Sequence, residues 1–327
     1  MASKAPGKHY RKGVSLRQFF KMFPDSATAE AWFAELRWGG SPACPHCGSL
    51  NVQSGATHKT MPYRCREKQC AKRFSVKTGT VMESSKLDYQ VWAMAIYLMS
   101  VNIKGVSSMK LHRDLDITQK SAWHLAHRLR KAYEANGGIF GGPVEVDETF
   151  IGGKRKNMSN AKRKALKESG AGRGADGKIA VAGIKDRRIN QVSAKMVENT
   201  DKTTLQGFVK EHVAGEATVY TDEARAYLGL PYKHESVKHS VSEYVRDQAH
   251  TNGIESFWAL LKRGYHGIYH KMSEKHLDRY ITEFVARHNT RENDTIQQMA
   301  GIASSMVGKR LKYEKLIADN GLSSGAR

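Results

Sequence analysis

Residues 144–151, Val-Glu-Val-Asp-Glu-Thr-Phe-Ile, decide the fold of the second half of the chain. The first, third and seventh of these residues are apolar, and apolar residues at alternate positions indicate a β-strand with one buried face. A glycine-rich linker, residues 137–143, precedes the strand and separates it from a helical and turn-rich part. The strand therefore begins a new domain, and it carries an acidic residue, Asp147, near its end.

The rest of this domain is predicted to combine strands and helices. We expect strands at 179–184 and 189–197 with a turn at 186–188, a helix at 201–214, a strand at 217–221, a helical region at 251–290, and one more helix ending near 318. Between the first two strands, residues 152–178 form a basic insertion that contains several glycines. We expect this insertion to be mobile in the absence of DNA.

Two aspartates and one glutamate of this domain are candidates for metal binding. Asp147 lies on the first strand, Asp222 just past a later strand, and Glu255 on a helix 33 residues further on. Carboxylate oxygens suit Mg²⁺, and two such ions about 4 Å apart can serve an in-line phosphoryl transfer. Glu148 and Glu223 follow the aspartates directly, so regular strand alternation should turn them away from the site. The alternative is that the aspartates are solvated strand ends.

The helix around Glu255 has one apolar and one polar face. At 100° per residue, the polar face presents Asn252, Glu255 and Lys262 together. A carboxylate for metal and a cation for DNA phosphate on one face fit phosphoryl transfer. The same residues also fit a capping box with Asn252 as N-cap and Glu255 at N3, which could coexist with catalysis. The apolar stripe consists of Ile254, Phe257, Trp258 and Leu261.

Four cysteines in the first part of the chain predict a zinc ribbon. Cys44-Pro-His-Cys47 is followed after 17 residues by Cys65, and four further residues separate Cys65 from Cys70. Two close thiolate pairs suit tetrahedral zinc, and four sulfur ligands leave no open position, so the zinc is structural. His46 is then a bystander. The alternative is four reduced, buried thiols without metal. The hairpin strands are expected at 63–65 and 73–75.

The remaining first part is predicted to be helical. Residues 15–38 form two helices broken at Pro24 and Asp25, and residues 87–135 form three. The last two of these, 105–115 and 119–133, are joined by a short turn in which Thr118 can cap the second helix. This layout is typical of a helix-turn-helix, with 119–133 as the recognition helix, although an ordinary helical bundle gives the same pattern. The outward side chains that we assign to DNA are Gln119, Lys120, His124, Arg128 and Lys131.

The charge of the chain favours a polyanionic partner. Fifty-three Lys and Arg against 32 Asp and Glu give a net charge of +21, and displacement of counterions from phosphates drives binding by such proteins. A basic ribosome-associated protein is the alternative. We also assign to DNA the basic residues Lys154, Arg155, Lys156, Lys162, Arg163, Lys164 and Arg263. No signal peptide or membrane-length apolar run is visible, so we expect a cytoplasmic protein with no membrane partner.

The motifs together resemble those of bacterial insertion-sequence transposases with a zinc-ribbon head and an ISXO-type DDE catalytic domain. The matching stretches are Cys44-Pro-His-Cys47, Cys65 with Cys70, Val146-Asp-Glu-Thr-Phe-Ile-Gly-Gly153, Thr221-Asp-Glu223 with Tyr227, His250-Thr-Asn-Gly-Ile-Glu-Ser-Phe-Trp258, Leu261-Lys-Arg-Gly264, Gly267, His270, His276-Leu-Asp-Arg-Tyr280 and Glu283-Phe284.

This resemblance implies a multidomain α+β protein whose catalytic domain is RNase H-like, with a mixed central sheet. The expected divisions are an N-terminal helical segment at 1–40, the zinc ribbon at 41–80, the helix-turn-helix segment at 81–136, the catalytic domain at 143–292 with the insertion at 152–178, and a C-terminal helix and tail at 293–327. The implied activity is DNA strand cleavage and transfer at terminal inverted repeats, dependent on Mg²⁺ or Mn²⁺.

By the same resemblance, Asp147 and Asp222 are the first two catalytic acids. Glu255 fits the third, with Asn252 as its rival, and Lys262 fits the basic residue that follows. Pairing of two element ends implies a homo-oligomer formed on DNA at the nucleoid. The competing functions are an inactive DNA-binding regulator, which would bind without cutting, and an RNase H-type nuclease, which would cut without joining.

Overall fold

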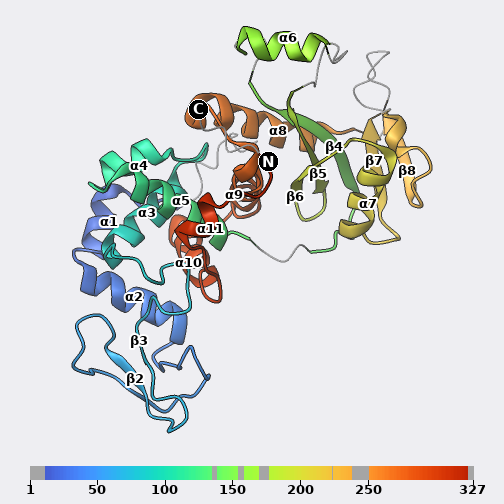
Figure 1. Cartoon of the computed structure of the whole chain (residues 1–327). Helices are drawn as coiled ribbons and strands as arrows, with labels where there is room; N and C mark the ends of the chain where they lie inside the picture. The colour runs from blue at the N-terminus through green and yellow to red at the C-terminus, as the bar shows by residue number, and fades with distance from the viewer. Residues whose placement is uncertain are drawn as a thin grey trace. The chain divides into compact units, whose positions relative to one another are not determined.

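The computed structural model describes residues 12–134, 138–153, 158–168, 177–222, 224–237 and 250–322, and within these ranges it leaves the side chains at 162, 166 and 237 undescribed. Contacts divide the chain into two compact units (Figure 1). The first comprises Met1–Glu134 and Thr290–Asp319, and the second Ala135–Asn289 and Asn320–Arg327. The segment after residue 290, which the sequence set apart as a tail, is therefore grouped with the N-terminal part.

The first unit, here called the head, is built mainly from helices. Asp25 begins the second helix as its N-cap and accepts a hydrogen bond from the Thr28 amide at 2.7 Å, so the predicted break lies where Pro24 and Asp25 placed it. Thr118 caps α5 in the same way through the Ser121 amide at 3.2 Å. The helices are α1 Leu16–Met22, α2 Ser26–Trp38, α3 Tyr89–Val101, α4 Ser108–Asp114, α5 Gln119–Ala132, α10 Thr295–Ser305 and α11 Tyr313–Ile317.

The core of the head surrounds Trp92 on α3, whose side chain is fully buried. Helix α10 contributes Met299 and Ile302 to this same core, and its C-cap residue Met306 lies there too. The C-terminal segment thus supplies part of the apolar interior on which the N-terminal helices pack. No helix in the described part of the chain is both long and apolar enough to cross a membrane.

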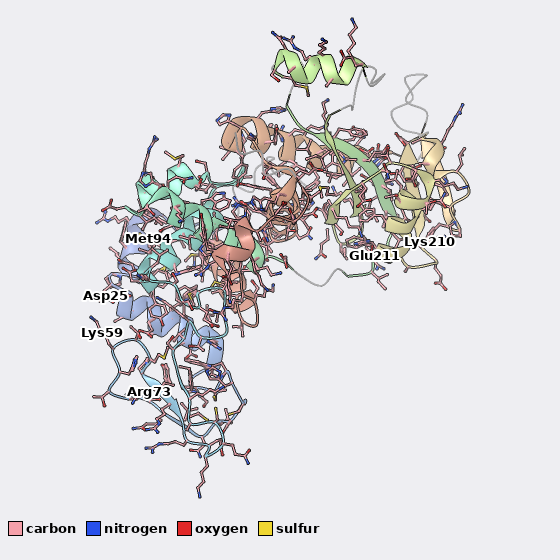
Figure 2. The ribbon with its side chains drawn as sticks, viewed as in Figure 1. Asp25, Lys59, Arg73, Met94, Lys210 and Glu211 are labelled. Atoms are coloured by element: carbon pink, nitrogen blue, oxygen red, sulfur yellow. The ribbon has the colours of Figure 1, made fainter. Side chains whose placement is uncertain are left out.

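The ribbon belongs to the head and contains a small antiparallel sheet of three strands. These are β1 Val52–Gln53, β2 Tyr63–Cys65 and β3 Arg73–Phe74, in the order β1-β2-β3. The β2–β3 hairpin lies where the sequence predicted it, whereas β1 was not predicted. Lys59 in the preceding loop and Arg73 on β3 are exposed (Figure 2).

The second unit is built on a five-stranded mixed sheet. Its strands are β4 Val144–Ile151, β5 Ile179–Asp186, β6 Gln191–Val197, β7 Thr218–Asp222 and β8 Lys233–Val237. The spatial order is β6-β5-β4-β7-β8, so the first strand along the chain lies at the centre. Only β5 runs opposite to the other four strands. The predicted strands are all present, and β8 is an addition to them.

Helices pack on both faces of this sheet. α7 Lys202–His212 shares one apolar cluster with β4, and α8 Asn252–Gly264 and α9 Leu277–Asn289 share another with β5 and β6. Because side chains of a strand alternate between faces, β4 presents Val144 and Val146 to α7 and its odd-numbered residues to α8. The insertion contains one further helix, α6 Asn160–Glu168.

The second half of the predicted linker is held to this unit. The Phe140 amide donates to the carbonyl of His212 at 2.8 Å, and the Gly142 amide donates to the buried Asp186 carboxylate at 2.9 Å. Gly142 also lacks room for a side chain, because a Cβ there would lie 2.7 Å from Asp186 Oδ1. These bonds fix the chain as it enters the central strand.

Candidate active site and metal centre

Asp147 and Asp222 lie on adjacent parallel strands at the centre of the sheet. Val144 pairs with Val219 and Glu145 with Tyr220 in parallel register. The same register carried forward places Asp147 beside Asp222. Asp147 lies in the middle of β4 rather than near its end, and Asp222 is the last residue of β7 rather than the first beyond it.

The electrostatics of this pair favour a bound cation. Burial, followed by the negative charges of Glu148 and Asp222, raises the pKa of Asp147 to about 7. Burial and the charge of Asp222 also raise the pKa of Glu148. Like charges crowded in a partly desolvated place disfavour ionisation unless a positive charge offsets them. The donor set therefore fits a divalent cation with oxygen ligands.

Glu148 also belongs to the acidic cluster around Asp147, although strand alternation alone made it a weaker candidate than Asp147. Its Oε2 accepts a hydrogen bond from the buried Tyr227 hydroxyl at 2.7 Å, and Tyr227 belongs to the apolar cluster on the α7 side of the sheet. Glu148 thus points away from α8, as predicted, yet its charge still reaches Asp147. The sequence contained one indication of this role for Glu148. Its partner Tyr227 belongs to one of the motifs that resemble those of the transposase family, but no function was assigned to it from the sequence. Glu223 lies outside the described residues.

Trp258 on α8 orients the Asp147 carboxylate. Its indole Nε1 donates to Asp147 Oδ2 at 3.0 Å. Asp147 is paired across the sheet with Gly183 of β5, and a Cβ on Gly183 would lie 2.5 Å from two atoms of the indole ring. The ring therefore occupies the space that a larger residue at 183 would fill.

Glu145, two residues before Asp147 on the same face of β4, holds the start of α8. Its buried carboxylate accepts from the Ile254 amide and from Arg187 Nε, each at 2.8 Å, and His250 Nδ1 lies 3.4 Å away. A carboxylate at a helix N-terminus satisfies amides that have no partner within the helix. Glu145 and Asp147 together join α8 to the central strand at two successive points.

The polar face of α8 is exposed as predicted, with Asn252, Glu255 and Lys262 on it and the four residues of the apolar stripe buried. The capping box was wrong in its register, because α8 begins at Asn252 with Thr251 as its N-cap. The Thr251 hydroxyl instead donates to Glu255 Oε1 at 2.9 Å. This bond draws the Glu255 carboxylate toward the first turn of the helix.

The structure does not bring all three predicted acids into one tight set. Over the described residues, the only group of three or more His, Cys, Asp or Glu whose ligand atoms all lie within 4.8 Å of one another is the cysteine cluster. Asp147 and Asp222 are neighbours by strand register, and Glu255 does not form such a group with them.

The four cysteines Cys44, Cys47, Cys65 and Cys70 meet as a zinc site requires. The sulfurs of Cys44 and Cys70 are 3.7 Å apart, and those of Cys47 and Cys65 are 3.6 Å apart. Tetrahedral zinc with bonds of about 2.3 Å places its sulfurs about 3.8 Å apart. The cluster therefore fits zinc, and His46 is exposed and outside it.

The predicted outward face of α5 is only partly free. The inner residues Ala122, Leu125, Ala126 and Leu129 are buried as predicted. Arg128, however, is only 9% exposed, and its Nε donates to the Leu311 carbonyl at 3.3 Å. His124 Nε2 lies 3.0 Å from the same carbonyl. The assignment of Arg128 to an open recognition surface was thus wrong, because the C-terminal segment covers that side of the helix.

The other predicted DNA contacts vary in their surroundings. Gln119 and Lys120 are exposed, and Lys120 Nζ lies 4.6 Å from the centre of the Tyr313 ring. Lys131 is paired with Glu134. On α6 the side chains of Arg163 and Lys164 are exposed, as is Arg263 on α8. Lys154, Arg155, Lys156 and the side chain of Lys162 lie outside the described part of the chain.

Comparison with known proteins agrees with this arrangement. Residues 139–289 match the model of the ISXO2-like transposase domain, and residues 24–73 match that of the transposase zinc-ribbon domain. A relative from Halobacterium salinarum, described as an uncharacterized protein in transposable element ISH50, is 27% identical over 252 residues. The alignment covers 74% of this chain and 84% of the relative.

The four-cysteine ribbon and the mixed sheet with paired central carboxylates both lie within these matched regions, and both matching models are those of transposase domains. The two matched regions together cover more than half of the 327 residues. The chain belongs to the insertion-sequence transposases that carry a zinc-ribbon domain and an ISXO2-like transposase domain.

Proposed function

We propose that this transposase binds the terminal inverted repeats of its insertion sequence and catalyses Mg²⁺-dependent cleavage and transfer of DNA strands. The observation that carries the proposal is the pairing of Asp147 and Asp222 on adjacent parallel strands, with the pKa of Asp147 raised to about 7. The strand order, with the second strand along the chain antiparallel, supports an RNase H-like fold for this unit. Helices α4 and α5 and the ribbon would supply DNA binding as a helix-turn-helix and a zinc domain.

Asp147 and Asp222 would hold the catalytic ions. When bound, two Mg²⁺ or Mn²⁺ ions activate the attacking oxygen and stabilise the leaving oxygen of the phosphodiester. Trp258 keeps the Asp147 carboxylate in one orientation, and Glu145 fixes the start of α8. Lys262, with Arg263 beside it, would neutralise DNA phosphates near the scissile bond.

The third ligand would come from the first turn of α8. Glu255 is a stronger ligand for Mg²⁺ than Asn252 because its carboxylate is charged. Glu255 accepts a hydrogen bond from Thr251, and it would exchange that contact for the cation on metal binding. We therefore propose Glu255 as the third acid, with Asn252 as the competing position.

The decisive experiment compares Asp147→Asn and Asp222→Asn with Asp201→Asn. Asp201 is an exposed N-cap of α7 in the same unit, and Asn caps a helix as well as Asp does. Each protein is incubated with a labelled DNA fragment that carries the element ends and with Mg²⁺ or Mn²⁺. We expect both site variants to bind the DNA but to lose cleavage by at least a hundredfold, while Asp201→Asn cuts as the wild type does.

The products separate the competing functions. A transposase yields nicked element ends and joined target DNA, whereas a nuclease yields nicks alone and a regulator yields neither. Full cleavage by Asp147→Asn or Asp222→Asn would remove the proposed site. The third ligand is tested with Glu255→Gln and Asn252→Ala against the exposed Glu198→Gln, with Mg²⁺-induced thermal stabilisation as a readout independent of turnover.

Transfer of an element requires that its two ends be held together. We propose that two or more copies of the chain assemble on paired end DNA. Light scattering of the protein with and without end DNA measures the number of chains in the complex, and an active complex with one chain would contradict the assembly.

A further inference from the structure

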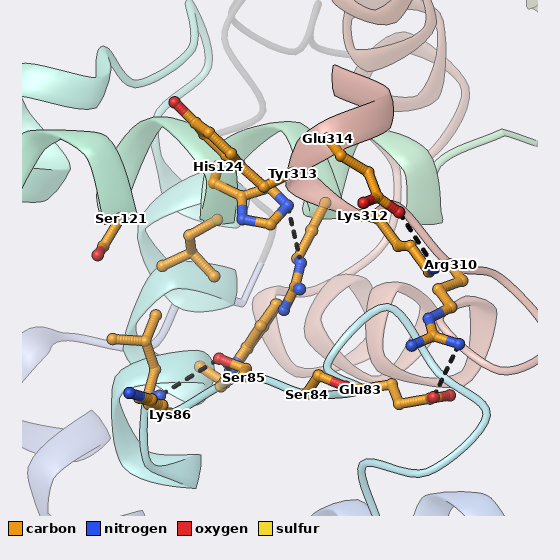
Figure 3. Close-up of a pocket in the computed structure, with 14 residues that line it drawn as sticks. Glu83, Ser84, Ser85, Lys86, Ser121, His124, Arg310, Lys312, Tyr313 and Glu314 are labelled. Atoms are coloured by element: carbon orange, nitrogen blue, oxygen red, sulfur yellow. Dashed lines mark hydrogen bonds and ion pairs between the residues drawn. The ribbon is translucent and has the colours of Figure 1, made fainter. Parts of the chain in front are cut away.

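The head contains a pocket of about 530 Å³ that is separate from the acidic site (Figure 3). Most of its lining comes from residues 83–87, one side of α5 and residues 310–314 of the C-terminal segment, and Trp92 of α3 completes it. All of these belong to the same compact unit. The pocket exists because the C-terminal segment lies along α5 and the 83–87 segment lies opposite.

The lining has an excess of positive charge. Arg310 pairs with Glu83 at 3.0 Å, and Lys312 pairs with Glu314 at 3.1 Å. Among the described residues, the two other cations of the lining, Lys86 and Arg128, have no carboxylate partner. The lining therefore carries two more positive than negative charges, and the carboxylate whose charge acts on Arg128, that of Glu83, is already paired with Arg310.

Arg128 is the cation of this lining whose hydrogen-bond donors are least satisfied by the chain. Its Nε is shared between the Leu311 carbonyl at 3.3 Å and His124 at 3.1 Å, and its terminal nitrogens have no hydrogen-bond partner among the described residues. Burial, and then the charge of Arg310, lower the pKa of Arg128. The unused terminal donors of Arg128, with the charge of Arg310 acting on the same guanidinium, could both be satisfied by one anion in the pocket.

Hydroxyl groups complete the lining beside these cations. Ser84 and Ser121 both line the pocket, and Ser121 Oγ accepts from the Thr118 hydroxyl at 2.9 Å, which leaves its own proton available. Guanidinium forks and hydroxyl donors match the oxygens of a phosphate better than those of a halide or a single carboxylate.

We propose that this pocket binds a phosphate group through Arg128, Arg310 and Lys86. The phosphate is either a phosphodiester of DNA or that of a free nucleotide or inorganic phosphate, since the recognising groups are the same. A DNA phosphate held here would anchor the head to the duplex at a point away from base contacts. The site is independent of cleavage, so it can be tested whether or not the acidic cluster proves catalytic.

The test uses Lys86→Gln and Arg310→Gln in the full chain, with Lys104→Gln as the matched control. Lys104 is exposed, lies in the same unit and does not line the pocket. Calorimetry with inorganic phosphate is run at constant ionic strength against chloride, and equal thermal midpoints confirm that each variant folds. We expect Lys86→Gln to weaken phosphate binding about fivefold or more, Arg310→Gln to weaken it further because Glu83 is freed, and Lys104→Gln to have no effect.

Titration of a duplex of arbitrary sequence over a range of salt identifies the source of the phosphate. If the pocket holds a DNA phosphate, Lys86→Gln lowers the slope of log affinity against log salt by about one unit relative to Lys104→Gln. If only phosphate binding changes, the ligand is a free phosphate compound. The proposal is overturned if the wild type shows no saturable phosphate binding and both pocket variants bind duplex as the control does.

Discussion

Ionisation of the Asp147 carboxylate is unfavourable, because this carboxylate is partly buried beside Glu148 and Asp222. An unfolded Asp titrates near 3.8, and in the folded chain the pKa of Asp147 is about 7. Between these values the folded state binds the extra proton, so its stability falls as pH rises through that window. A cation at this place would remove the penalty.

Asp147→Asn tests this reasoning directly. Without added Mg²⁺, the variant is expected to be more stable than the wild type, and its advantage should grow by about 2 kcal/mol between pH 5 and pH 8. The asparagine can still accept the Trp258 hydrogen bond. Urea unfolding at both pH values measures the difference, and an advantage independent of pH would contradict the raised pKa.

Gly183→Ala tests the contact between the sheet and the indole of Trp258. The added Cβ would lie 2.5 Å from the ring, so the indole must move and lose its bond to Asp147. We expect a loss of about 2 kcal/mol in unfolding free energy and a large fall in cleavage. Gly207→Ala, in the open on α7, is the control and should be neutral or slightly stabilising. A folded and fully active Gly183→Ala protein would refute the role of the ring.

Residues differ in how far the sequence could assign them. Asp147 and Asp222 follow apolar runs that predict strands, and their roles were inferred from local pattern. Glu145 and Gly183 have roles that depend on a helix more than 70 residues away, and no local pattern reports such a partner. Glu148 was considered a weaker candidate than Asp147 because strand alternation predicts only the direction of its side chain. Alternation does not show that the charge of Glu148 acts on Asp147 from the other face of the sheet.

At the scale of elements, periodicity predicted which helices and strands form but not what covers them. The helical wheel of α5 identified the buried side correctly and treated Arg128 as exposed. A helical wheel describes only one helix, so it cannot show that Leu311, almost 200 positions later, packs against the outer side of α5. Strand β1 was missed because its two residues lie outside the cysteine motifs, and β8 was missed because its sequence, Lys-His-Glu-Ser-Val, contains only one apolar residue.

The ribbon is the element whose stability should depend on its metal. Trp38 at the end of α2 lies 5.0 Å from the Tyr63 ring and 6.1 Å from the Phe74 ring, beside the cysteine cluster. A strong chelator should therefore release one zinc per chain, change the emission of Trp38, and expose all four thiols of the protein to a thiol reagent. A Trp38→Phe variant identifies the emission change. Four thiols that already react before chelation would show that no metal holds them.

At the scale of the whole molecule, the head is made from two stretches of chain that the second unit separates in sequence. This division could not be predicted from the sequence, because a polar tail with one helix is typical of a terminal appendage. Leu311 and Leu316 are buried, and Lys309 Nζ donates to the Ala132 carbonyl at 2.6 Å at the end of α5. The C-terminal segment is thus part of the head.

A stop codon after Val307 should therefore destabilise the head while leaving the second unit folded. Loss of two buried leucines and of the Lys309 bond predicts a decrease of about 4 kcal/mol in the unfolding free energy of the head. Thermal unfolding followed by calorimetry resolves the units. Truncation after Leu322 keeps every one of these contacts and should unfold as the full chain does. An unchanged head in the shorter protein would contradict the packing described.

The divided head also sets the order in which the protein matures on the ribosome. The strands and helices of the second unit have all been synthesised before the last thirty or so residues of the head are made. At that stage the nascent chain contains the whole five-stranded sheet, whereas the outer side of α5 is not yet covered by the C-terminal segment. Completion of the head must therefore wait for residues 290–319, so a message that ends before them yields a chain with an incomplete head.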